Sequence, residues 1–290
     1  GRWGEDDERG TLNFITPDMV ARAAGCVRTG KMFDLGINFD ERGPQPGGGR
    51  INPVRTMRQT GHEQIFEGAV RIADDVVFMP LQCATQWDAL AHVHYDGELY
   101  NGFPNSELSS RGAGRCSVDK LSPGIAGRGV LLDIAGLYDQ DWLDADQPIR
   151  ATDLEGAVER QGVEITRGDI LLIRTGWRRN LLVQRDRRTW STREPGLTLD
   201  CVDWLYERDI AALAADNWGI ELFPGEVAGE TLPVHMVLLR DMGMPLGEMF
   251  DLESLAAECR TTGRWDCFLA APVLKFTHGV GSPTSPLAII

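Results

Sequence analysis

The stretch GDILLIRTG, residues 168–176, is a short apolar run bounded by glycines. Such a run indicates a buried β-strand, because it is too short for a typical helix and is enclosed by turn-forming residues. Similar runs predict further strands, most of them buried, at DVVFMPLQC (75–83), GVLLDI (129–134) and IAALAAD (210–216). A strand-like run, CFLAAPVLKF, follows at 267–276.

Helical segments are interspersed with these strands, at ITPDMVARAAG (15–25), TDLEGAVER (152–160), DCVDWLYERD (200–209) and FDLESLAAEC (250–259). Their starts carry capping signals: Thr16 as N-cap before Pro17, a capping box of Thr152 and Glu155, and Asp251 as N-cap. Strands and helices mixed in this order predict an α/β protein with a central sheet covered by helices. The pattern leaves the order of the strands open.

The composition is that of a globular protein with an acidic surface. The chain has 290 residues, 42% hydrophobic and 25% charged, and a formal net charge of −14. This charge argues against nucleic acid and anionic membranes as partners, because both would repel it. No composition break divides the chain, so we expect one domain spanning residues 1–290, with ERGPQPGGGRINP (41–53) as an irregular loop.

The sequence also carries features typical of a cytoplasmic protein. No apolar run approaches the ~18 residues that span a bilayer, and the opening residues do not resemble a secretory signal. The six cysteines are scattered without a CxxC pair, which favours reduced thiols over a disulfide framework. We therefore expect a cytoplasmic location.

Polar side chains concentrate in QCATQWDALAHVHYDG, residues 82–97. If the strand that starts near Asp75 continues through this stretch, its alternation puts Gln82, Gln86 and Asp88 on one face. Asp88 is a possible ligand for a divalent ion, and His92 is a possible ligand or general base. From these residues alone, a solvent-facing strand end remains an open alternative.

Five separated segments resemble one known family, and they occur in its order: residues 1–24, TQWDALAH (85–92), RTGW (174–177), PGL (195–197) and HMVLLRDMGMPLGEMFDLESL (235–255). This is the metal-dependent cyclase family, which includes bacterial kynurenine formamidase and isatin hydrolase. The resemblance implies its swivelling β/β/α three-layer fold, in a homodimer or homotetramer.

The family motif H-x-G-T-H-x-D-x-x-x-H falls on residues 82–92, where Gln82 and Gln86 replace two metal-binding histidines. By the resemblance, a second ligand set survives as Asp88, His235 and Glu248, although the gap from His235 to Glu248 is one residue longer than usual. One outcome is a single Mn²⁺ or Zn²⁺ ion on this set, with Gln86 as a further oxygen ligand.

The other outcome is a metal-free pocket in which His92 and Asp88 handle protons while Gln82 and Gln86 orient a carbonyl. His92 matches the family's last motif histidine, which resembles a general base. His94 has no counterpart in the motif, and we expect it to line the pocket.

Aromatic side chains near the predicted loops suit a flat, ring-containing substrate. Gln82, Trp87, His94 and Trp218 are the residues expected to contact it. Trp218 follows Asp216 at the end of a predicted buried strand, where α/β proteins commonly collect their site residues.

The family resemblance, with these features, implies a hydrolase, metal-dependent in the manner of the family, that cleaves an amide, formamide or lactone acyl bond in a small cyclic or aromatic molecule. Two alternatives stay open. One is a metal-independent cyclase or dehydratase acting on a polyketide-like or aromatic metabolite. The other is a degenerate small-molecule-binding protein without turnover.

Overall fold

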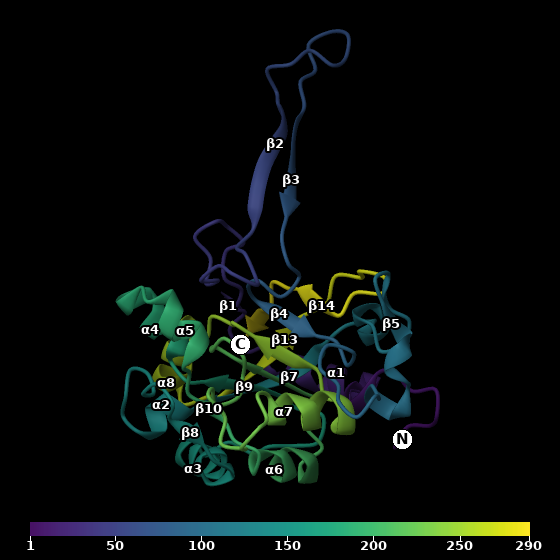
Figure 1. Cartoon of the computed structure of the whole chain (residues 1–290). Helices are drawn as coiled ribbons and strands as arrows, with labels where there is room; N and C mark the ends of the chain where they lie inside the picture. Colours follow the sequence, from purple (N-terminus) through teal and green to yellow (C-terminus); the bar gives the residue numbers. More distant parts are fainter.

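A nine-stranded sheet organises the chain in the computed structural model, which describes all 290 residues (Figure 1). The strands lie in the order β1 (Met32–Asp34), β15 (Leu287–Ile289), β13 (Asp266–Ala270), β7 (Ala126–Asp133), β9 (Ile170–Arg174), β11 (Ala212–Ala215), β12 (Leu246–Glu248), β4 (Gln86–Asp88) and β14 (Gly281–Pro283).

The middle of the sheet is parallel and both flanks are antiparallel. Strands β7, β9, β11 and β12 run parallel, whereas β4 pairs antiparallel with both β12 and β14. The predicted strands at 129–134, 168–176 and 210–216 are confirmed as β7, β9 and β11, and the run at 267–276 overlaps β13 over its first four residues only. Every side chain of β9 and β11 is buried, as expected for strands covered on both faces.

The helices are short and cover the sheet, with α3 and α6 on the lower side in Figure 1. Their bounds are α1 (Pro17–Ala23), α2 (Ile134–Leu137), α3 (Ala151–Gln161), α4 (Trp177–Gln184), α5 (Arg187–Thr192), α6 (Cys201–Glu207), α7 (Pro233–His235), a π-helix (Met236–Met242) and α8 (Glu253–Thr262). Turns of 3₁₀-helix occur at Gly10–Phe14, Ala24–Cys26, Tyr100–Gly102, Asn105–Glu107 and Val118–Leu121. None of the helices combines the length and apolarity needed to cross a bilayer.

Two of the predicted helix starts agree closely with the structure. Thr16 is the N-cap of α1, and its hydroxyl accepts a hydrogen bond from the Met19 amide. Helix α8 has Leu252 as its N-cap, one residue later than predicted. The Asp251 carboxylate still accepts from the Glu253 amide, so it caps the first turn from one position upstream.

The capping box predicted at Thr152 and Glu155 is wrong. Helix α3 begins at Ala151, so its third residue is Asp153, whose carboxylate accepts a 2.7 Å hydrogen bond from the Arg150 amide. Glu155 instead faces α6, where it accepts from the Trp204 indole at 2.8 Å. The helix therefore starts before the pair of residues that resembles a capping box.

The strand predicted at 75–83 is wrong in extent and in burial. Strand β3 (Ala73–Phe78) ends early and pairs with β2 (Val54–Thr60) in a hairpin that projects from the body (Figure 1). Every residue of β3 is exposed, because neither face of the hairpin meets a core. Residues 79–85 turn back into the body before β4 starts at Gln86.

Three two-stranded ladders lie outside the main sheet. Besides β2 and β3 they are β5 (Leu108–Ser109) with β6 (Gly112–Ala113), and β8 (Pro148–Ile149) with β10 (Gly196–Leu197). The main core contains 53 buried residues, and a smaller cluster forms around Trp177, Trp190 and Met249. All six cysteines are buried and free, as the sequence predicted.

The RTGW segment joins the end of β9 to its neighbours through buried polar contacts. Arg174 pairs with Asp133 of β7 and Glu253 of α8, each at 2.8 Å. The Asp216 carboxylate accepts from the Thr175 hydroxyl at 2.6 Å and from the backbone amides of residues 175 and 176. Burial raises the pKa of Asp216 to about 6. Asp216 therefore fixes the ends of β9 and β11.

We predict that Gly247→Ala destabilises the fold by about 1–3 kcal/mol through overpacking. A Cβ at Gly247 would lie 2.7 Å from the Ala214 side chain and 2.8 Å from the Trp87 ring. Gly156→Ala in α3 is the control, because its Cβ would meet only Leu137 at 3.4 Å. In urea unfolding, the free energy of unfolding should fall in Gly247→Ala. In Gly156→Ala it should change by no more than about 1 kcal/mol. Equal stability of the two variants would contradict the packing argument.

Candidate active site

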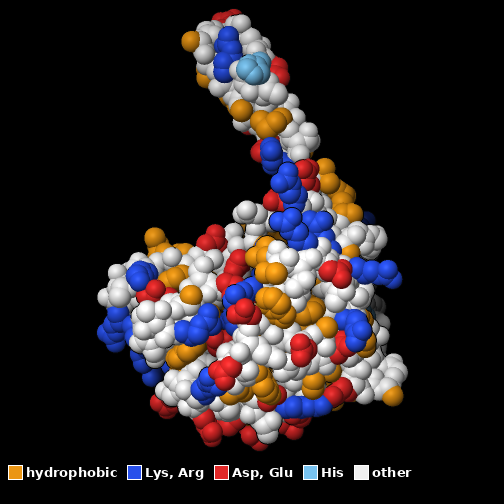
Figure 2. Space-filling view, turned by 90° about the vertical axis from the view of Figure 1, so that its left-hand side faces the viewer, with side chains coloured by type: hydrophobic (Ala, Val, Ile, Leu, Met, Phe, Trp, Pro, Cys, Tyr) orange, Lys and Arg blue, Asp and Glu red, His pale blue; other side chains and the backbone are white.

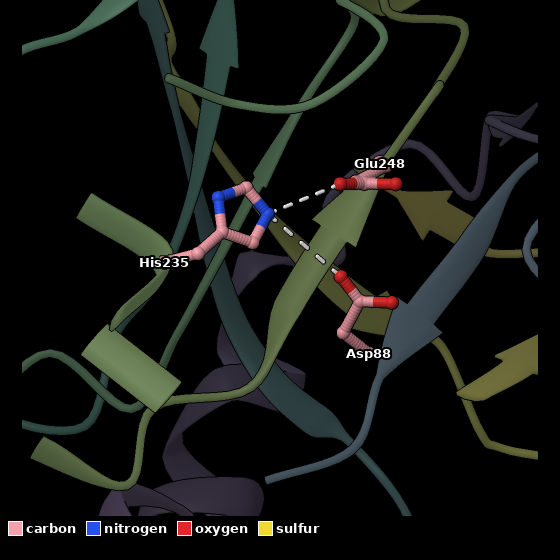
Figure 3. Close-up of side chains that lie close together, drawn as sticks. All are labelled: Asp88, His235 and Glu248. Carbon is pink, nitrogen blue, oxygen red and sulfur yellow. Dashed lines mark hydrogen bonds and ion pairs between the residues drawn. The ribbon is translucent and has the colours of Figure 1, made fainter. Parts of the chain in front are cut away.

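Three ionisable side chains from three separate elements converge beside the sheet (Figure 3). They are Asp88 from β4, Glu248 from β12 and His235 from α7, and one ligand atom of each lies within 4.8 Å of the others. His235 Nε2 is 3.3 Å from Glu248 Oε1 and 3.9 Å from Asp88 Oδ2. All three side chains are buried. The set implied by the family resemblance is thus brought together in space.

The register between β4 and β12 positions the two carboxylates. Gln86 lies directly opposite Glu248, and Asp88 lies two residues further along β4, so all three share one face of the sheet. Trp87 points to the other face, where its ring meets Phe250 edge-on at 5.4 Å. The alternation predicted for residues 82–88 therefore holds over 86–88, the part that is a strand.

Glu221 fixes the orientation of His235. Its carboxylate accepts from the Val234 amide at 3.0 Å, from the His235 amide at 2.8 Å and from His235 Nδ1 at 2.5 Å. With Nδ1 bound there, Nε2 faces Asp88 and Glu248. A carboxylate behind an imidazole is the usual partner of a metal-binding histidine. Glu221 ends the segment ADNWGIE, but no spacing in the sequence marks it.

Gln86 lies between the two carboxylates. Its amide nitrogen donates to Glu248 Oε2 and, at 3.3 Å, to Asp88 Oδ1. Gln86 Oε1 and Asp88 Oδ2 are buried without a hydrogen-bond partner. Rotating the Gln86 side-chain amide by half a turn would exchange its nitrogen and oxygen, so that the oxygen faces the two carboxylates. Oxygens that face one another repel, so this arrangement requires a cation between them.

The buried charges of the site leave an excess of negative groups. Burial raises the pKa of Asp88 well above its usual value, and the Glu248 charge raises it further. Burial likewise raises the pKa of Glu194, which lies nearby and accepts from the Trp218 amide at 2.6 Å. Burial opposes the charge on His235, but hydrogen bonds to Glu221 and Glu248 outweigh it and raise its pKa to about 10. Two carboxylates, an imidazole and unpartnered oxygens fit one divalent cation.

His92 lies on the segment after β4, with Nε2 at 3.7 Å from Asp88 Oδ1. Burial lowers its pKa to about 4, and the Arg50 charge, with Arg50 Nη2 at 3.4 Å from Nε2, acts in the same direction. His92 is therefore neutral at pH 7. A neutral imidazole whose Nε2 accepts a hydrogen bond is able to take up a proton.

Arg50 and Trp218 form the outer wall of the site. The Arg50 guanidinium lies over the Trp218 ring, with 5.4 Å to the ring centroid, and Nη1 is 3.4 Å from the Gln82 carbonyl oxygen. The Trp218 indole faces the Gln45 side-chain oxygen at 3.4 Å. The sequence marked residues 41–53 as a loop, but nothing in it pointed to Arg50 or Gln45 as neighbours of the site.

The four residues expected to contact a substrate have different positions. Trp218 lines the outer wall, and the Gln82 side chain lies against Gly281, the strand partner of Asp88. His94 is half-buried on the segment after His92. Trp87 is fully buried in the core and donates its indole N–H to the Ala271 carbonyl at 3.0 Å, so the substrate-contact prediction for it is wrong. Its large aromatic ring is core packing.

The fold is that of a mixed α/β protein class with known members. Residues 33–222 match the family described as "Putative cyclase". The chain belongs to this cyclase family. The resemblance inferred from the sequence and the α/β fold it implied are both confirmed.

Three solved structures show how similar this chain is to known proteins. A novel cyclase is 39% identical with a TM-score of 0.93, covering 100% of this chain and 98% of that chain. Isatin hydrolase A from Ralstonia solanacearum is 20% identical with a TM-score of 0.65, and the match covers 94% of this chain and 95% of that chain. A potential metal-dependent hydrolase with cyclase activity is 18% identical with a TM-score of 0.55, and the match covers 89% of this chain and 96% of that chain. No curated protein matches the sequence.

Because the pKa of His92 is lowered, we predict that its ring becomes protonated at an unusually low pH in chelator-treated protein. Its ring NMR signal, identified by its loss in His92→Gln, should stay at the neutral position from pH 8 to 5 and shift near pH 4, against about 6.5 for a free histidine. Since the unfolded chain binds this proton first, His92 also makes the fold less stable as the pH falls from 6.5 to about 4. A midpoint above pH 6 would contradict the buried, neutral state.

Proposed function

We propose that this protein is a hydrolase that cleaves the acyl C–N or C–O bond of a small cyclic amide, formamide or lactone. The observation that carries the proposal is the convergence of Asp88, His235 and Glu248 beside a neutral His92. Acyl hydrolysis needs a polarised carbonyl and a base for the attacking water, and this arrangement offers groups for both.

Asp88, His235 and Glu248 would hold one divalent ion, and Gln86 would add an oxygen once its amide is turned. Mn²⁺ and Zn²⁺ both suit oxygen and imidazole ligands. When bound, the ion supplies Lewis-acid chemistry at the substrate carbonyl oxygen. Glu221 keeps His235 Nε2 directed at the ligand position.

His92 takes the proton of the attacking water at Nε2. The water oxygen then bonds to the acyl carbon, the C–N or C–O bond breaks, and the leaving nitrogen or oxygen receives the proton from His92. Arg50 lies beside this nitrogen and disfavours its protonation before reaction. The positive charge of the Arg50 guanidinium, beside His92, would also stabilise an oxygen that gains negative charge.

The outer wall of the site, formed by Arg50 and Trp218, favours a planar substrate. The Trp218 ring and the Arg50 plane above it offer stacking surfaces to a flat molecule. Isatin, a cyclic amide fused to an aromatic ring, is the substrate named for proteins of the same fold. Isatin and related cyclic amides are therefore the first molecules to test.

A second candidate is a metal-independent cyclisation or dehydration of an aromatic or polyketide-like metabolite. The observation that favours it is the Gln86 amide, which donates to both Asp88 and Glu248. In this case His92 and Asp88 exchange protons with the substrate, and Gln86 holds the carboxylates in place.

Two variants, purified without chelator or metal-affinity steps, test the proposal. We predict about one Mn²⁺ or Zn²⁺ per wild-type chain, no metal in Asp88→Asn, and full metal content in His92→Gln. In a panel of isatin, N-formylkynurenine and a γ-lactone, at least one compound should be hydrolysed, and His92→Gln should slow its turnover by about 10²- to 10⁴-fold.

Elemental analysis and product detection give separate readouts. Hydrolysis that persists in metal-free protein would replace the metal-dependent mechanism by the metal-independent one. Metal retained in Asp88→Asn, or full turnover in His92→Gln, would contradict the assigned residues.

We further infer that the chain forms a homodimer or homotetramer through its β2–β3 hairpin. The hairpin exposes apolar side chains, among them Val54, Val76, Val77 and Phe78, the last at 72% exposure. A two-stranded hairpin is marginal in water by itself, and its unpaired edges invite a further strand. A second copy of the chain offers a matching surface by symmetry.

Substituting Val76→Thr and Phe78→Thr together should yield monomers in analytical ultracentrifugation, whereas wild type sediments as an oligomer. Neither side chain is buried within one chain, so the monomer should keep its stability. Leu274→Thr, at an apolar position of 53% exposure outside the hairpin, is the control and should stay oligomeric. A monomeric wild type at micromolar concentration would refute the inference.

A further inference from the structure

A second hollow lies away from Asp88, His235 and Glu248, on the side of α4 and α5. It has a volume of about 520 Å³ and is lined by residues of segment 37–44, of α4, of the turn after α4 and of the start of α5. Four of its lining residues are Arg42, Arg178, Arg185 and Arg187. Figure 2 views this side of the molecule, on which several Lys and Arg side chains lie at the surface. Such a cluster is unexpected in a chain with a net charge of −14.

None of these four arginines forms an ion pair. Nearby Arg179 pairs with Asp141 at 3.0 Å, and Arg193 pairs with Asp146. Within the pocket, Arg178 Nε is buried without any hydrogen-bond partner. Burial lowers the pKa of Arg178, and the charges of Asp251, Asp216 and Asp40 offset this effect only in part. A buried donor without a partner is costly, so a missing acceptor is indicated.

The lining offers little negative charge to fill this role. Asp40 is the one carboxylate that lines the pocket, and its Oδ1 already accepts from the Arg42 amide at 2.6 Å. The two walls are connected, because Arg187 Nη2 donates to the Arg42 carbonyl at 2.6 Å. The Arg187 side chain is therefore held against the opposite wall before any ligand arrives, which lowers the cost of ordering this one arginine on binding.

We propose that this pocket binds a small polyanion that carries at least two phosphate or carboxylate groups. Planar guanidinium groups bind such oxygens through paired hydrogen bonds, and several are needed to neutralise more than one acidic group. The volume lies in the usual range for a small-molecule site. A large polyanion such as nucleic acid is disfavoured by the acidic charge of the whole chain. The site is independent of the proposed hydrolysis.

Calorimetric titration of the full chain with pyrophosphate and with citrate tests this site, with inorganic phosphate and matched sodium chloride as comparisons. We expect one site per chain, tighter binding of pyrophosphate or citrate than of phosphate, and no effect of chloride. The tighter of the two polyanions identifies phosphate or carboxylate as the preferred group.

Arg178→Gln and Arg42→Gln should each weaken binding by at least about tenfold, since each removes a charge-assisted contact. Arg188→Gln is the matched control, because Arg188 follows Arg187 in α5 but does not line the pocket. Arg42 is exposed, so its variant tests the site even if Arg178→Gln folds poorly. Absence of saturable binding to wild type, or equal affinity in Arg42→Gln and Arg188→Gln, would overturn the proposal.

Discussion

The burial of several carboxylates around one histidine is the constraint on which the rest of the site depends. Asp88, Glu194, Glu221 and Glu248 are all buried, and an isolated carboxylate is costly to remove from water. The structure offsets this cost by donors from three directions: the amides at the start of α7, the Gln86 amide and the imidazole of His235. Acidic groups that remain crowded after such compensation favour a cation or a shared proton.

The segment between β1 and β2 connects features that lie apart in space. Residues 37–44 of this segment line the second pocket, the one that contains Arg42 and Arg178. Further along, Gln45 contacts Trp218 and Arg50 contacts His92. Between the last two residues the chain passes Gly47 and Gly48, which both have positive φ and open space where a Cβ would lie. These glycines let the chain turn between Gln45, which donates to the Cys83 carbonyl, and Arg50 beside His92. One loop therefore connects the outer wall of the active site to the second pocket.

Much of the fold and part of the site could be predicted from the sequence. Buried strands such as β9 and β11 are apolar on both faces, so their pattern is plain, and the family motifs led to Asp88, His235 and Glu248. Glu221 and Arg50 were missed because their roles arise from tertiary contacts that no local pattern records. The hairpin strand β3 was predicted as buried because its valines resemble those of a core strand. Trp87 was assigned to the substrate because an aromatic next to site residues gives no sign of which face it occupies.

Strand β4 carries the start of the site, yet both of its neighbours come from late in the chain, as β12 at 246–248 and β14 at 281–283. A chain synthesised from its N-terminus therefore holds Trp87 and Asp88 without strand partners until almost all of it has left the ribosome. Such a segment exposes an aromatic ring and open backbone groups for much of translation. The order of synthesis thus makes assembly of the site one of the last events in folding.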